Sequence, residues 1–210
     1  MILEQSRKTD GQFPLWQPWI FSGMPTADAF TYISSLYFPN YVLNLLFQSS
    51  HLNQLLHLIF TGLGGFVFLR FLGLSKIVAF MGGTAFMITP FMITMIVFGH
   101  GSQMMTAAYL PWIMWMTIKV MTKPSFCGVG LLAVLMGFQL QRAHAQIAYY
   151  TWMLAGAYVL FYLLWNIKNT KETKINWLGL GGFLLASLLG IGIALLIYLP
   201  SIEYTPFSVR

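Results

Sequence analysis

The sequence predicts an all-α membrane protein with about six membrane-crossing helices. Hydrophobic residues make up 58% of the 210 residues and charged residues only 8%, whereas a soluble domain carries about 25% charged residues. The apolar residues gather in runs long enough to cross the ~30 Å hydrocarbon core of a bilayer. Basic residues fall in the short junctions between these runs. A soluble fold is a remote alternative, because the polar part of the chain is too small to cover so much apolar surface.

Residues 1–50 are expected to form a loop region on the non-cytoplasmic side of the membrane. Pro14, Pro18, Pro25 and Pro39 are spread through it. Proline fixes φ and has no backbone donor, so one continuous helix is excluded. Residues 41–47 (YVLNLLF) are too short to span a bilayer, and they predict a short helix lying in the membrane interface.

Six apolar runs follow, and each predicts a membrane-crossing helix. At 1.5 Å per residue, about 20 residues cover the hydrocarbon core. The predicted spans are residues 52–71, 77–98, 104–121, 126–140, 147–167 and 177–199. Residues 201–210 are interpreted as the truncated start of a further outward loop, and the chain is expected to be a fragment of a longer protein.

Glycines inside these runs predict close helix packing. Gly82 and Gly83, followed by Pro90, predict a loosened or kinked second helix. Small residues at membrane helix interfaces allow backbones to approach, which favours packing over gating. The same interpretation applies to four glycines of the last run, namely Gly181, Gly182, Gly190 and Gly192.

The basic residues predict the orientation in the bilayer. Seven of them lie at the junctions after the first, third and fifth runs: Arg70, Lys76, Lys119, Lys123, Lys168, Lys171 and Lys174. The other junctions hold only Arg142. Excess Lys and Arg marks the cytoplasmic side. The N-terminal region, the junctions near His100 and His144, and the C-terminus are therefore predicted to face outward.

Polar residues concentrate at two of the outward junctions, GHGSQ at residues 99–103 and QLQRAHAQ at residues 139–146. Arginine offers a planar fork of donors that matches phosphate oxygens, and histidine donates or carries a proton near neutral pH. These junctions predict a binding site for a lipid-linked phosphate or sugar, with the candidate residues His100, Gln103, Arg142, His144 and Gln146. The alternative is a set of solvated loop residues in which Arg142 touches ordinary lipid headgroups.

Few other residues point to chemistry. His57 is the one ionisable residue well inside a predicted span, and a contact with a neighbouring helix is the favoured interpretation. The absence of Asp and Glu from all six spans argues against an ion-coupled transporter. Asp28 is a weak candidate for a general base, since a lone loop aspartate is more often a turn residue.

No metal or cofactor is predicted. The single cysteine, Cys127, excludes an internal disulfide and a multi-cysteine metal site, and no histidine pair has the helical spacing of a metal site. The chain lacks a phosphate-cradling glycine loop. Although the net charge is +6, the basic residues are scattered among the junctions, which argues against nucleic acid.

Several segments together resemble the bacterial YfhO membrane proteins. PLWQPWIFSGMP at residues 14–25 is similar to a motif of that family. The similarity continues through FPN at 38–40, FGHGSQ at 98–103, GFQ at 137–139, HAQIAYY at 144–150 and EYTPFSVR at 203–210. These segments occur in order over nearly the whole chain.

The resemblance implies a multispanning glycosyltransferase of the GT-C type in the bacterial cytoplasmic (inner) membrane. Such an enzyme would transfer a sugar from a polyprenyl-phosphate carrier to a cell-envelope polymer on the outer face. His100, Gln103, His144 and Gln146 match family positions. The acidic base expected early in the first outward loop has no convincing match in this chain. The alternative is a non-catalytic lipid-carrier translocase or envelope-assembly scaffold.

Overall fold

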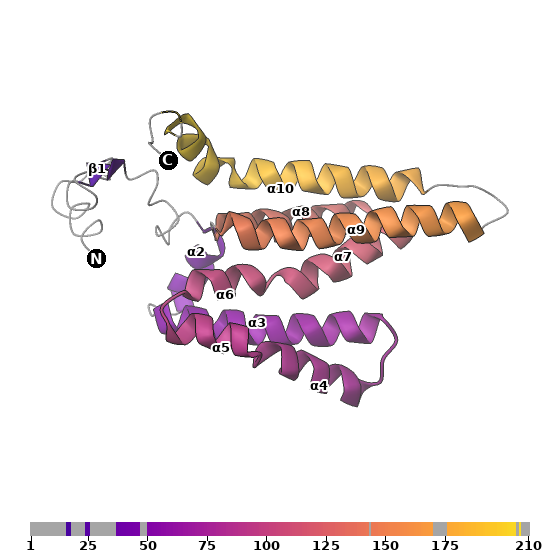
Figure 1. Ribbon diagram of the computed structural model, residues 1–210, viewed down its shortest axis with the longest axis horizontal. Helices are drawn as coiled ribbons and strands as arrows, with labels where there is room; N and C mark the ends of the chain where they lie inside the picture. Colours follow the sequence, from indigo (N-terminus) through magenta and orange to yellow (C-terminus); the bar gives the residue numbers. More distant parts are fainter. Residues whose placement is uncertain are drawn as a thin grey trace.

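The computed structural model is a bundle of roughly parallel and antiparallel helices (Figure 1). It describes residues 16–17, 24–25, 37–46, 50–142, 144–169, 176–204 and 206. Two two-residue strands, β1 (Trp16–Gln17) and β2 (Met24–Pro25), pair antiparallel. The helices are α2 (Pro39–Leu46), α3 (Ser50–Phe71), α4 (Lys76–Met87), α5 (Pro90–Val97), α6 (Gly101–Ala107), α7 (Leu110–Thr122), α8 (Phe126–Gln141), α9 (Ala145–Asn169) and α10 (Trp177–Tyr204).

The chain is a multi-pass α-helical membrane protein. Four described segments are long and apolar enough to cross a bilayer, namely Leu52–Phe71, Lys76–Val97, Ala145–Ile167 and Trp177–Leu199. They coincide with the first, second, fifth and sixth predicted spans. Helix α8, the fourth prediction, is apolar but shorter, with 16 residues. The predicted helix at residues 41–47 is present as α2.

Prolines divide two of the predicted spans. The second breaks between α4 and α5, where Pro90 occupies the first turn of α5, so the predicted kink is confirmed. The third was expected as one helix over residues 104–121. That expectation is wrong in its continuity, because the helix stops at Ala107 and restarts at Leu110. Pro111 cannot donate to the carbonyl of Ala107, and its ring crowds that carbonyl.

Glycines let several helices approach closely, as predicted. A β-carbon on Gly83 of α4 would lie 2.6 Å from the carbonyl oxygen of Gly62 in α3. One on Gly190 of α10 would lie 3.2 Å from the carbonyl oxygen of Ala133 in α8. Gly181 and Gly192, by contrast, face open space, so the close packing predicted for these two glycines is wrong. These contacts fix α3 against α4 and α8 against α10 by backbone proximity.

The bundle has two chemically different ends (Figure 1). The α3–α4 and α7–α8 junctions, with Arg70, Lys76 and Lys123, lie at one end, together with the C-terminal end of α9 and the N-terminal end of α10. The α5–α6 and α8–α9 junctions lie at the opposite end, where α2 also packs. We call the latter the site end. The grouping of the junctions matches the alternation predicted from the sequence.

Candidate functional site

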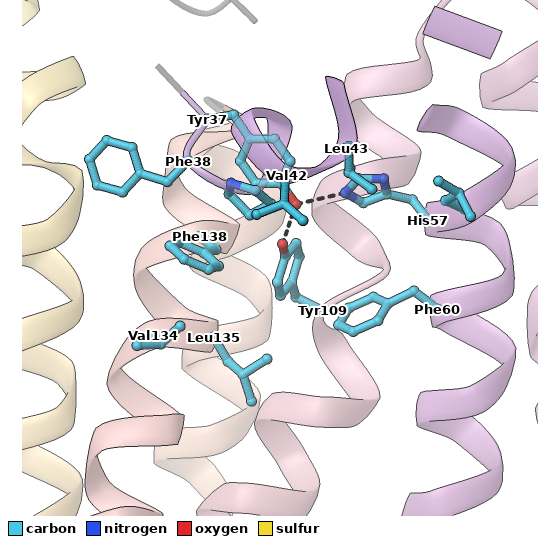
Figure 2. Close-up of a pocket in the computed structure, with 12 residues that line it drawn as sticks. Tyr37, Phe38, Val42, Leu43, His57, Phe60, Tyr109, Val134, Leu135 and Phe138 are labelled. Atoms are coloured by element: carbon cyan, nitrogen blue, oxygen red, sulfur yellow. Dashed lines mark hydrogen bonds between the residues drawn. The ribbon is translucent and has the colours of Figure 1, made fainter. Parts of the chain in front are cut away.

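Three aromatic side chains meet in a buried hydrogen-bonded chain at the site end. Tyr37, just before α2, is 2% exposed. Its hydroxyl lies 2.7 Å from Nε2 of His57 on α3, and it is also hydrogen-bonded to the hydroxyl of Tyr109, between α6 and α7. Figure 2 shows the three polar groups converging from these separate elements. The sequence predicted a contact of His57 with a neighbouring helix, and its partner is Tyr37, two residues before the start of α2.

The direction of each hydrogen bond in this chain follows from its last acceptor. Nδ1 of His57 lies 2.8 Å from the carbonyl oxygen of Asn53, and a carbonyl only accepts, so we assign the proton to Nδ1. A neutral imidazole then accepts at Nε2, so the Tyr37 hydroxyl must donate to it. The Tyr37 oxygen in turn accepts from the Tyr109 hydroxyl. Burial raises the pKa of Tyr37 to about 12, outweighing the opposing effects of the Tyr109 bond and the Arg142 charge, which keeps the phenol neutral.

Arg142 lies against the ring of Tyr37. Its guanidinium carbon is 4.6 Å from the centroid of the Tyr37 ring, a cation–π distance. The side chain is 9% exposed. Sequence analysis placed Arg142 at an outward junction open to phosphate or lipid headgroups, whereas its side chain is buried in the bundle. Arg142 caps α8, and its side chain turns into the bundle against Tyr37.

The buried Arg142 charge has no carboxylate beside it in the described part of the chain. Among the described residues the one acid is Glu203, which is exposed, and no salt bridge to Arg142 is formed there. Nε of Arg142 also has no hydrogen-bond partner among the described residues. Burial lowers the pKa of Arg142, and the two tyrosines oppose that shift. A buried guanidinium with an unused donor is suited to receive an anion.

His144 lies near both Arg142 and His100 at the same end. Nε2 of His144, at the start of α9, is 2.8 Å from the hydroxyl oxygen of Ser102 on α6. Partial burial lowers the pKa of His144, and the nearby charges of Arg142 and His100 lower it further. His100 caps α6 and is exposed. The structure thus brings together three of the predicted site residues from two junctions.

Gln103 and Gln146 form no side-chain hydrogen bond to these three residues within the described part of the chain. Gln103 is half-buried on α6. Gln146 is exposed, and its amide donates to the Tyr150 hydroxyl at 2.9 Å. Asp28, the candidate base, lies outside the described residues. The structure therefore brings Arg142, His144 and His100 together at the site end, and we call this group the cationic cluster after the permanent charge of Arg142.

An apolar cavity of about 510 Å³ lies beneath α2 (Figure 2). Its walls come from α2, α3 and α8, and its polar end is formed by Tyr37, His57 and Tyr109. Pockets of about 300–1,000 Å³ hold small ligands. Its lining side chains are Tyr37, Phe38, Pro39, Val42, Leu43, Leu56, His57, Phe60, Tyr109, Val134, Leu135 and Phe138.

Sequence analysis counted Gln139 and Gln141 among the polar residues of an outward junction and missed that they hold this end together. Gln139 is fully buried and donates to the Thr106 carbonyl at 3.1 Å and the Thr151 hydroxyl at 3.0 Å. Gln141 accepts from the Phe38 amide at 3.1 Å and donates to the Ile193 carbonyl at 3.1 Å. The two amide side chains in an otherwise apolar helix could have predicted these contacts, because amides away from water must form hydrogen bonds within the protein.

Neither family models, curated proteins nor solved structures show a match to this chain. The described residues contain no cluster of three or more His, Cys, Asp or Glu able to hold a metal ion. The chemistry available at the site end is therefore that of a buried arginine, two histidines, phenols and amides next to an apolar cavity. Within this set, the buried guanidinium is the group suited to receive an anion.

Proposed function

We propose that the chain is part of a YfhO-type membrane glycosyltransferase that takes a sugar from a polyprenyl-phosphate carrier. The acceptor would be a cell-envelope polymer on the non-cytoplasmic side of the bacterial inner membrane. The sequence resemblance suggests this activity. The structural observation that carries the proposal is the buried Arg142, which has no carboxylate partner among the described residues.

The physical reason is the energetic cost of burying an unpaired charge. A buried charge costs several kcal/mol unless it is paired and hydrogen-bonded. The Tyr37 ring offsets part of this cost at 4.6 Å, with cation–π contacts contributing about 0.5–2 kcal/mol. A phosphate would supply the missing anion, and the unused Nε of Arg142 would donate to it.

The remaining residues would have distinct roles in this proposal. His144 and His100 would donate hydrogen bonds to phosphate oxygens, while Gln103 and Gln146 would bind the sugar. During transfer an acceptor oxygen would form a bond to the anomeric carbon as the carbon–oxygen bond to the phosphate breaks. The acceptor's proton would pass to a carboxylate, and that carboxylate would come from outside the described residues.

The test measures transfer of labelled sugar from polyprenyl-phosphate sugar by the full-length protein in proteoliposomes. Arg142→Ala removes a charge-assisted interaction of about 1.5–3 kcal/mol, so we expect at least about a tenfold loss, and His144→Ala is expected to weaken transfer as well. Arg70→Ala is the matched control, because Arg70 is an exposed arginine at the opposite end. Unchanged transfer in both site variants would remove them from the mechanism.

The alternative is a non-catalytic lipid-carrier translocase or assembly scaffold. It is favoured by one observation, that no described carboxylate lies beside the cationic cluster. The same reconstituted protein distinguishes the two functions. The translocase or scaffold would be favoured if the wild-type protein binds polyprenyl phosphate but transfers no sugar, and if Arg142→Ala abolishes the binding.

A further inference from the structure

The cavity beneath α2 is chemically different from the cationic cluster. None of its lining residues carries a formal charge at neutral pH when His57 is the neutral tautomer assigned above, and Arg142 is not among them. A phosphate inside it would meet hydrocarbon and aromatic rings, with no cation among the lining side chains to offset its desolvation. The occupant that fits this cavity is therefore a neutral molecule with a largely apolar body.

The hydrogen-bonded chain defines what kind of head that molecule must carry. The Tyr109 hydroxyl donates to Tyr37, and the Tyr37 hydroxyl donates to His57. Both phenolic protons thus form hydrogen bonds. The imidazole proton of His57 does so too, because Nδ1 donates it to the Asn53 carbonyl oxygen. The group left over is the oxygen of Tyr109, which receives no hydrogen bond from any described residue. The polar end of the cavity offers an acceptor and no donor.

From this geometry we propose that the cavity binds a lipid alcohol, whose hydroxyl donates to the phenolic oxygen of Tyr109. A ketone, ester or ether head offers acceptors only, and it would face the Tyr109 oxygen without forming a hydrogen bond. A hydroxyl completes the hydrogen-bonded chain, because it donates to the Tyr109 oxygen, which receives no hydrogen bond from the described residues. The inference does not depend on sugar transfer, since it involves other residues and a ligand of another charge.

The cavity also opens to the surface of the bundle, so a long hydrocarbon chain need not fit inside it. Three of its lining side chains remain exposed: Phe38 at 40%, Val42 at 62% and Val134 at 37%. Phe138, Leu135 and Val134 line one side and Phe60 lies across from them (Figure 2). A hydrocarbon chain can lie along these side chains and extend between α2 and α8 into the bilayer.

The experiment uses the full chain in lipid nanodiscs with two photoactivatable probes. One is a hexadecanol carrying a mid-chain diazirine, and the other is its methyl ether, which has the same chain and no donor. One net hydrogen bond corresponds to about a three- to tenfold difference in affinity. We expect the alcohol to label peptides of α2 and α8 by that factor over the ether. Equal labelling by the two probes, or labelling elsewhere in the bundle, would overturn the proposal.

Variants locate the site. Tyr109→Phe is expected to lower the ratio of alcohol labelling to ether labelling, because it removes the accepting oxygen. Val134→Trp fills the cavity and is expected to suppress both probes, whereas Leu131→Trp, on the same helix and 41% exposed, is the matched control outside the cavity. If Tyr109→Phe does not fold, the proposal is still tested by comparing the alcohol and ether probes on the wild type and on the two tryptophan variants. Stronger labelling by a hexadecanoic acid probe than by the alcohol would assign the ligand to Arg142 and refute the inference.

Discussion

The buried Gln139 side chain allows the strength of the hydrogen bonds at the site end to be measured. It lies on α8 and joins two other helices through Thr106 of α6 and Thr151 of α9. Its carbonyl oxygen also accepts from the indole nitrogen of Trp152 at 3.2 Å. Replacing it with leucine keeps a side chain of similar bulk and removes all three bonds. We therefore expect Gln139→Leu to destabilise the bundle.

The expected magnitude follows from two independent considerations. Side-chain hydrogen bonds between membrane helices average about 0.6 kcal/mol each, so three of them contribute about 2 kcal/mol. A buried donor left without an acceptor, here the Trp152 indole, costs about 1–3 kcal/mol. These two figures describe overlapping effects and are not added. The free energy of unfolding should therefore fall by about 2 kcal/mol.

The measurement is reversible unfolding of the protein in mixed micelles, following helix content as denaturing detergent is added. Gln146→Leu is the matched control, because that exposed glutamine makes a single bond to Tyr150. Surface changes of this kind are usually within about 0.5 kcal/mol. The reasoning fails if Gln139→Leu is as stable as the wild type, or if the two leucine variants lose equal stability.

Two further predictions concern packing and pH. Gly83→Ala forces a β-carbon against the backbone of α3, and this overpacking should lower the free energy of unfolding by at least about 1–3 kcal/mol. The control is Gly181→Ala, whose β-carbon meets open space and should leave unfolding in detergent unchanged. Equal losses of stability in the two variants would contradict the packing. The pKa of His144 is lowered in the fold, so the unfolded chain binds a proton first as the pH falls through about 6.5, and stability falls with it. His144→Gln should flatten this dependence in melting curves between about pH 7.5 and 5.5, and an unaltered pH dependence would contradict the assignment.

The helical architecture could be predicted because apolar run length is a direct consequence of bilayer thickness. Four predicted spans are present as long apolar segments, and Pro90 marks the predicted interruption of the second. Pro111 carried the same signal for the third span, yet the apolar run around it was interpreted as continuous. A proline inside an apolar run marks a position where a backbone hydrogen bond is missing. Applying that rule to Pro111 as well as to Pro90 would have divided α6 from α7.

The site could be predicted only in part, because side-chain direction depends on tertiary packing. The junctions correctly grouped Arg142, His144 and His100 at one end of the bundle. Nothing in the sequence indicated that Arg142 turns inward onto Tyr37, since that contact joins residues about a hundred positions apart. The hydrogen-bonded chain was missed for the same reason: Tyr37, His57 and Tyr109 come from three elements, and no local spacing relates them.

The location of the site follows from how membrane helices are held together. Lipid is as apolar as the helix surfaces, so association depends on close packing and on hydrogen bonds between helices. Glycine contacts such as Gly83 with α3 need no particular polar partner. At the site end, the segment before and within α2 is instead anchored by directional bonds from the Tyr37 hydroxyl to His57, from the Phe38 amide to Gln141, and from Asn53 to Asn40. A segment held in that way has one position rather than several, so the same bonds that secure α2 also set the Tyr37 ring against Arg142 and its hydroxyl over the cavity.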